Sequence, residues 1–142
     1  MFVYLTAAFS VAPQIAPRDL ETARDAGFTH IINNRPDGEE AGQPASEMMR
    51  AAAEAAGLAY TAIPVDHSGF DMGQVEAMAA VLAASSGPVL AFCRSGTRSA
   101  NLWALAEASR GGSPDEIIAA AGATGRYNVA GLRPMLVQLA GK

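Results

Sequence analysis

The one cysteine of the chain lies in a stretch whose residue types and spacing suit covalent catalysis. Cys93 follows the apolar run Val89–Phe92, and a short polar loop leads from it into an alanine- and leucine-rich helical pattern. In such a strand–loop–helix unit the loop amides lie at a helix N-terminus, where N–H groups and the helix dipole favour an anion. A thiolate and a bound anion are both stabilised there, so we interpret Cys93 as a nucleophile.

Two arginines in the loop add positive charge near the sulfur. Thiolate is the nucleophilic form of cysteine, and neighbouring positive charge favours it. Gly96 allows the loop to curl, so Arg98 could turn its guanidinium toward the sulfur and fork onto the oxygens of an anion. Arg94 is expected to face solvent or a substrate tail. Hydroxyls that could orient the thiolate or cap the helix come from three residues of the same stretch: Ser95, Thr97 and Ser99.

An inert, buried cysteine is the alternative explanation of Cys93. It leaves unexplained why two arginines and a glycine stand among the next five residues. A metal site is disfavoured, because one cysteine and two distant histidines lack the spacing of metal ligands. We therefore expect neither a metal nor another cofactor.

Composition limits the partners of the protein. A length of 142 residues predicts a single domain over 1–142. The net charge is −4, so the chain lacks the excess of positive charge with which proteins bind nucleic acids and anionic membranes. No run of 18 apolar residues occurs, and the start of the chain lacks the pattern of a signal peptide. A single cysteine fits a reducing compartment, so we expect a cytoplasmic protein.

The elements that must position the cysteine loop alternate between strands and helices. Strands are expected over Phe2–Leu5, Phe9–Ala12, Phe28–Asn33, Leu58–Val65 and Val89–Cys93. Helices are expected over Pro17–Gly27, over Ser46–Gly57 with Ser46 as N-cap, over Met72–Ala84, from the cysteine loop to Ser109, from Ser113 to Gly122, and over Leu132–Ala140. Met48, Met49, Met78 and Trp103 are expected in the core. This order predicts an α/β fold with a mainly parallel central sheet and helices on both faces.

Ligands of such sheets bind beyond the carboxyl ends of the strands. The loops after Asn33, Val65 and Phe92 should meet at that edge. Further pocket candidates in the first two loops are Asn34, Arg35, Asp37 and His67. Arg35 would add positive charge, and Asp37, Glu39 or Glu40 could orient Arg98 or Arg35 by ion pairing. A plain turn with solvated glutamates explains that loop equally well.

Two known loop types are similar to the cysteine loop. The segment Cys93–Ser99 resembles the active-site loop of rhodaneses, in which four residues separate cysteine and arginine. The loop of tyrosine and dual-specificity phosphatases has five residues between them, and Ser99 stands at that arginine position. More widely, Ile31–Glu40, Gly42–Pro44 and Phe92–Trp103 resemble the bacterial DUF442 family, the phosphatase-like domain of beta-lactamase hydrolase-like proteins. This resemblance implies a three-layer, dual-specificity-phosphatase-like fold.

Members of that family are described both as phosphatases and as sulfurtransferases. The shorter loop predicts a tighter amide cradle, which favours a cysteine-bound sulfur over a tetrahedral phosphoryl group. The expected function is therefore a rhodanese-like sulfurtransferase. Cys93 would take sulfur from a small anionic donor, thiosulfate or a persulfide, and pass it to an acceptor thiol.

Two alternatives stay open. A phosphatase would act on a phosphate ester through a phosphocysteine and needs a general acid. Asp66, 27 residues before Cys93, is the candidate, with Asp71 in reserve and His67 able to do similar work. Asp66 could equally be an ordinary turn or capping residue. A non-enzymatic persulfide carrier or anion-binding module is the third possibility.

Overall fold

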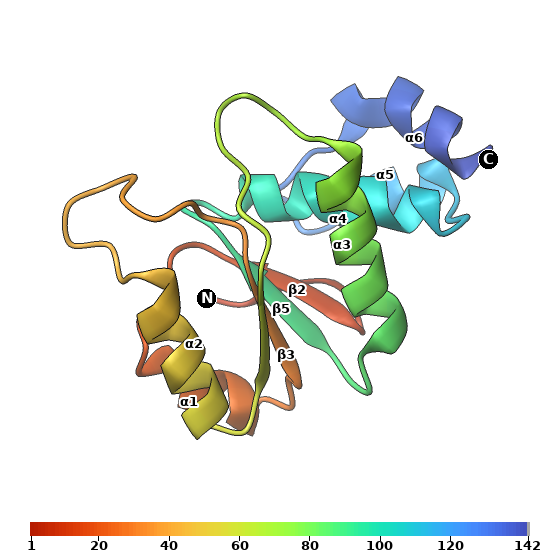
Figure 1. Ribbon diagram of the computed structural model, residues 1–142. Helices are drawn as coiled ribbons and strands as arrows, with labels where there is room; N and C mark the ends of the chain where they lie inside the picture. Colours follow the sequence, from red (N-terminus) through yellow and green to blue (C-terminus); the bar gives the residue numbers. More distant parts are fainter. Residues whose placement is uncertain (142) are drawn as a thin grey trace.

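Five short strands form one sheet in the order β1-β2-β5-β3-β4, in a computed structural model (Figure 1) that describes residues 1–141. The strands are β1 (Val3–Thr6), β2 (Phe9–Ala12), β3 (His30–Asn33), β4 (Ala59–Ala62) and β5 (Val89–Phe92). β2, β5, β3 and β4 pair in parallel, and only β1 runs antiparallel, beside β2. The mainly parallel sheet expected from the alternating pattern is confirmed.

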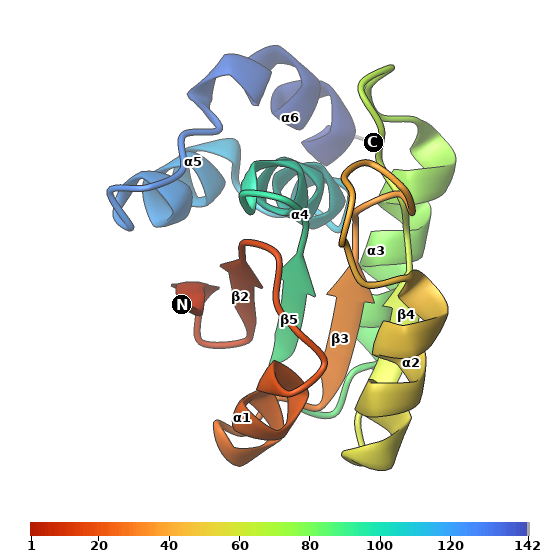
Figure 2. The ribbon, with the colours of Figure 1, turned by 90° about the vertical axis from the view of Figure 1, so that its left-hand side faces the viewer.

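Helices cover both faces of this sheet (Figures 1 and 2). One face carries α1 (Asp19–Asp25) and α2 (Ser46–Ala55). The other carries α3 (Met72–Ala84), α4 (Thr97–Ser109), α5 (Pro114–Gly122) and α6 (Arg133–Ala140), with the 3₁₀ turn η1 (Ala130–Leu132) before α6. The three-layer α/β class is therefore confirmed, and β5 and α4 hold the centre of the molecule.

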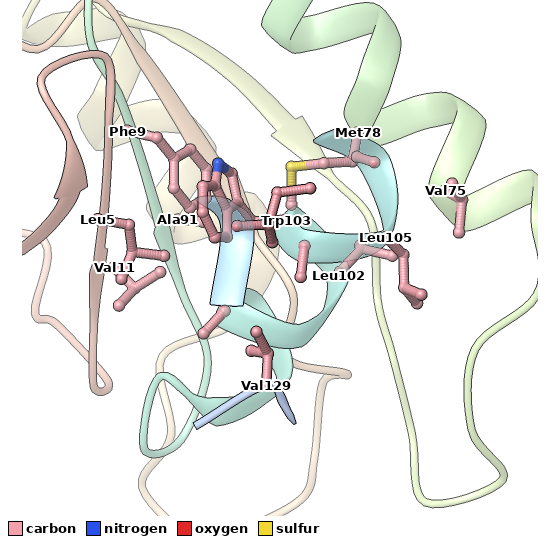
Figure 3. Packing of buried hydrophobic residues seen from close by; sticks show 14 of the residues in the cluster. Leu5, Phe9, Val11, Val75, Met78, Ala91, Leu102, Trp103, Leu105 and Val129 are labelled. Atoms are coloured by element: carbon pink, nitrogen blue, oxygen red, sulfur yellow. The ribbon is translucent and has the colours of Figure 1, made fainter. Parts of the chain in front are cut away.

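The central strand β5 is buried on both faces, as parallel strands between two helical layers must be. Its alternate residues enter the two cores: Ala91 faces the α3–α6 side, and Leu90 and Phe92 face α1 and α2. On the α4 side, Trp103 stacks on Phe9 with ring centroids 5.8 Å apart (Figure 3). Trp103 is thus a core residue, as expected, and it fixes α4 against the sheet.

Two local expectations are wrong. Ser46 is the first residue of α2 and not its N-cap, which is Ala45. The Asp37 carboxylate accepts a hydrogen bond from the Ser46 N–H at 2.8 Å, and the Ser46 hydroxyl pairs with the Tyr60 hydroxyl instead. Met48 is 56% exposed because it lies on the outer face of α2, whereas Met49 and Met78 are fully buried.

Among residues 1–141, none of the helices combines the length and the hydropathy needed to traverse a lipid bilayer.

Candidate active site

Three loops meet at the carboxyl edge of the sheet because their strands are in register. Asn33 lies opposite both Phe92 of β5 and Ala62 of β4, so Asn34, Cys93 and Ile63 leave the sheet together. The Asn34 N–H donates to the Phe92 carbonyl at 2.8 Å, and the Asn34 side-chain amide donates to the Ile63 carbonyl at 2.8 Å. The predicted convergence is therefore present, and a buried asparagine fastens it.

One backbone N–H of the cysteine loop donates to the sulfur. Cys93 is completely buried, and the Gly96 N–H donates to its Sγ at 3.1 Å. Gly96 is also the N-cap of α4, with φ of +95°, a conformation that glycine adopts without steric cost. The sulfur thus lies beside the N-terminus of α4, where the helix dipole stabilises negative charge.

Arg98 joins the cysteine loop to the two neighbouring loops. Its guanidinium forks onto the Glu39 carboxylate through Nη1 at 2.8 Å and Nη2 at 2.9 Å. Nη1 also donates to the Val65 carbonyl at 2.6 Å. The bonds to Glu39 are the main cause that raises the pKa of Arg98, and the nearby Cys93 sulfur acts in the same direction. Arg98 therefore lies near enough to the sulfur to be affected by its charge, and its forked end already holds a carboxylate.

Glu39 is shared between two arginines. Oε1 also accepts from Nε of Arg35 at 2.9 Å, and Arg35 is buried beneath it. Arg35 completes its contacts with Gln14 Oε1 at 3.0 Å and Glu40 Oε1 at 3.2 Å. Hydrogen bonds from Arg98 and then Arg35 lower the pKa of Glu39 to about 2. Of the three acidic residues proposed to orient these arginines, Glu39 does so for both.

Replacing Glu39 with glutamine should destabilise the protein in a pH-dependent way. The pKa of Glu39 falls from 4.5 to about 2 on folding, so its stabilising contribution is complete above pH 4.5. That contribution is lost as the pH falls toward 2. We expect E39Q to lose about 1–2 kcal/mol of unfolding free energy at pH 7, and the difference from the parent to shrink between pH 4.5 and 2.

Urea unfolding at several pH values measures this difference. E47Q is the matched control, because the Glu47 side chain is 85% exposed and its ion pair with Arg50, at 3.5 Å, lies at the surface. A deficit in E39Q that stays constant from pH 7 to pH 3 would contradict the assignment of an ionised Glu39 as the partner of Arg98 and Arg35.

The three hydroxyls of the stretch have different partners. Ser99 is buried in α4 and donates to Asn34 Oδ1 at 2.8 Å, which ties the cysteine helix to the neighbouring loop. Ser95 donates to the Thr97 hydroxyl at 3.0 Å, and both side chains lie at the surface. Gly96 caps α4 without a side-chain hydrogen bond. The expected hydroxyl contribution comes from Ser95, whose Oγ accepts from the Thr97 N–H, the first N–H of α4, at 3.4 Å.

Arg94 and Asp37 lie farther from the sulfur. The Arg94 side chain is 70% exposed, and its Nη2 is 3.9 Å from Glu40 Oε2. Its expected orientation toward solvent agrees with this exposure. Asp37 caps α2 and does not hold an arginine in residues 1–141.

Asp66 follows β4 but does not have the environment of a general acid. It is exposed, and its Oδ1 accepts hydrogen bonds from the hydroxyl and the N–H of Ser68. The side-chain bond from Ser68 is the main cause that lowers the pKa of Asp66, so the carboxyl carries no proton near neutrality. His67 is exposed beside it, and Asp71 caps α3 by accepting from the Gln74 N–H at 2.8 Å. The acid role of Asp66 stays a prediction, with these contacts against it.

Sequence reasoning did not single out Gln14 or the Val65 carbonyl, and it offered Tyr127 only as part of a candidate pocket wall, Arg126–Asn128. Gln14 binds Arg35 through its side chain and the Arg94 carbonyl through its N–H, at 3.2 Å. The Val65 carbonyl holds Arg98, and the Tyr127 hydroxyl donates to the Ser95 carbonyl at 3.0 Å. The polar cluster Arg126–Asn128 was the one signal for Tyr127, and it is equally typical of a loop.

No three histidine, cysteine, aspartate or glutamate side chains within residues 1–141 gather closely enough to hold a metal ion.

Comparison with known families and proteins agrees with this arrangement. Residues 1–110 match the model of the family described as "Beta-lactamase hydrolase-like protein, phosphatase-like domain". A beta-lactamase hydrolase-like protein of Agrobacterium fabrum is 38% identical over 109 residues, which are 77% of this chain. Those residues cover 25% of that relative, so the chain matches about a quarter of its length.

Solved structures give the same result. The structure of a candidate phosphatase from Neisseria meningitidis superposes with a TM-score of 0.80 at 33% identity, covering 96% of each chain. PTPMT1, solved in complex with PI(5)P, has a TM-score of 0.75 at 14% identity, covering 99% of this chain and 97% of that one. The latter likeness shows the fold alone. Together they show that the buried cysteine lies in the dual-specificity-phosphatase-like fold that the sequence resemblance implies.

Proposed function

Since the chain belongs to the family of the phosphatase-like domain of beta-lactamase hydrolase-like proteins, we propose that it hydrolyses phosphate esters through a phosphocysteine on Cys93. The observation that carries this proposal is the Gly96 N–H on the Cys93 sulfur at the N-terminus of α4. That environment stabilises the thiolate and would bind the oxygens of a phosphoryl group. The comparisons support this alternative better than the sulfur transfer that the loop length favours.

The reaction proceeds in two displacements. The Cys93 thiolate attacks phosphorus, so that a P–S bond forms while the P–O bond to the leaving group breaks with its electron pair on oxygen. Water then attacks phosphorus, the P–S bond breaks, and inorganic phosphate leaves as the thiolate is restored. Three N–H groups of Arg98 are engaged by Glu39 and Val65, so an anion would meet the Nε edge of its guanidinium.

The substrate class that we propose follows from the contacts of Asp66, which disfavour its role as general acid. Since Asp66 is deprotonated and bound to Ser68, esters whose leaving group needs no protonation, such as aryl phosphates, should react fastest. The PI(5)P complex of PTPMT1 supports a phosphate ester as substrate for this scaffold.

Sulfur transfer is the second candidate. The contact of Asp66 with Ser68 and the contact of Arg98 with Glu39 favour it. Transfer from thiosulfate or a persulfide to an acceptor thiol does not strictly require a general acid, and a persulfide on Cys93 needs less space than a phosphoryl group. Cys93 would attack the outer sulfur of the donor, whose remaining fragment leaves with the bonding electron pair. The acceptor thiolate would then take that sulfur and release Cys93.

Intact mass measured after separate incubations with an aryl phosphate and with thiosulfate distinguishes the candidates. A phosphoryl adduct, trapped by rapid acid quenching, together with released phosphate supports the hydrolase. A sulfur adduct that an added thiol removes catalytically supports the transferase. An adduct that forms once without turnover indicates a persulfide carrier. A protein that forms no adduct and releases no phosphate overturns both proposed activities.

A further inference from the structure

Tyr127 contacts the active-site loop from outside the region that defines the family. It lies after α5, beyond the matched residues 1–110, and it is 8% exposed. Its hydroxyl donates to the Ser95 carbonyl at 3.0 Å. Burial is the main cause that raises the pKa of Tyr127, so the hydroxyl keeps its proton and remains a donor near neutral pH.

The Ser95 carbonyl belongs to the same peptide unit as the Gly96 N–H. This peptide is trans, so its C=O and N–H point in opposite directions. Tyr127 binds the oxygen end of the unit, and the Cys93 Sγ accepts from the nitrogen end at 3.1 Å. The tyrosine and the cysteine therefore hold the two ends of one peptide plane.

Glycine makes this peptide plane easy to rotate. A flip of the unit changes φ of Gly96 from +95° to a negative value, and glycine adopts both. In the flipped state a carbonyl oxygen would face the sulfur in place of an N–H, and it would repel a thiolate. The Tyr127 hydroxyl opposes this flip, because the Ser95 oxygen would lose its donor. A side chain at position 96 would overlap the tyrosine hydroxyl.

We propose that Tyr127 is a positioning residue that orients the Ser95–Gly96 peptide so that its N–H stabilises the Cys93 thiolate. This role goes beyond the proposed function, because it concerns the ionised sulfur and not the group that the sulfur attacks. Besides Tyr127, Arg98 is the titratable group that acts on the Cys93 sulfur, and it is held in place by Glu39.

The experiment measures the pH profile of Cys93 alkylation by iodoacetamide, followed by intact mass. The chain has one cysteine, so every adduct reports on Cys93. For Y127F we expect the profile to move upward by about one pH unit, because the Gly96 N–H, no longer held by Tyr127 through the Ser95 carbonyl, would lose its hydrogen bond to the thiolate. Near the lower end of the profile the rate should fall about tenfold, with an unchanged limiting rate at high pH.

Two further variants separate this role from a structural one. Y60F removes another buried tyrosine hydroxyl, one that pairs with Asn33 and Ser46, and it should lower thermal stability without moving the profile. Y127A should move the profile as far as Y127F does. A parental profile in Y127F, or a shift seen in Y127A alone, overturns the proposal. The alkylation needs no substrate, so a failed phosphatase assay leaves this test intact.

Discussion

Turnover should fall by at least about 10⁴-fold when Cys93 is replaced with serine. A hydroxyl is not ionised near neutral pH, and within residues 1–141 neither histidine is hydrogen-bonded to the Cys93 side chain to act as its base. His30 pairs with the Thr61 hydroxyl at 2.8 Å, and His67 is exposed beside Asp66. Serine is close to cysteine in size and fits the buried site, so the C93S protein should keep its fold.

Release of phosphate from an aryl phosphate and transfer of sulfur from thiosulfate are the measurements for C93S. Both assays report on the same nucleophile, so the result does not depend on which activity is correct. Binding of orthophosphate, followed by calorimetry, serves as the control and should persist. Turnover within tenfold of the parent would remove Cys93 as nucleophile.

Arg98 should be the second most sensitive residue. We expect R98K to lower kcat/KM by about 10²–10³-fold, since lysine offers a point charge where arginine offers a planar fork. Lysine cannot bind both Glu39 oxygens and the Val65 carbonyl while also facing the sulfur. Circular dichroism and thermal melting separate any loss of fold from loss of activity.

R94K is the matched control, because Arg94 is 70% exposed and 3.9 Å from its nearest acidic partner. It should change kcat/KM by less than about threefold, as expected for a surface ion pair. A larger loss in R94K than in R98K would mean that Arg94 is the anion ligand.

The fold was predictable because its signals are local. Apolar runs that alternate with helical patterns indicate a parallel sheet, and a parallel sheet brings the loops after Asn33, Val65 and Phe92 to one edge. The position of Cys93 before a helix N-terminus follows from this order alone. These features need no knowledge of which side chains meet.

The partners of the polar side chains were less predictable, because they depend on contacts between distant segments. Asp37, Glu39 and Glu40 are all acidic residues of the loop after Asn33, and their positions in the sequence do not distinguish them. Of these three, Glu39 is the one that binds Arg98, 59 residues further along the chain. Ser99 binds Asn34 and not the sulfur, and Tyr127 reaches across from the end of α5. The number of residues between Cys93 and Arg98 also could not decide between sulfur and phosphate. Loop length limits the size of the anion-binding loop, but it does not reveal which groups Arg98 binds.

The shared carboxylate between Arg35 and Arg98 has a consequence for the charge of the whole site. Arg35, Arg94 and Arg98 carry three positive charges against the two negative charges of Glu39 and Glu40, so the proposed thiolate form of Cys93 would make the cluster electrically neutral. Replacing the thiolate with a persulfide anion preserves that neutrality. A phosphate dianion adds two negative charges, which only the helix dipole and the loop amides remain to balance. A thiosulfate dianion would meet the same imbalance, so net charge distinguishes a persulfide from a phosphoryl group on Cys93 but not the two incoming substrates.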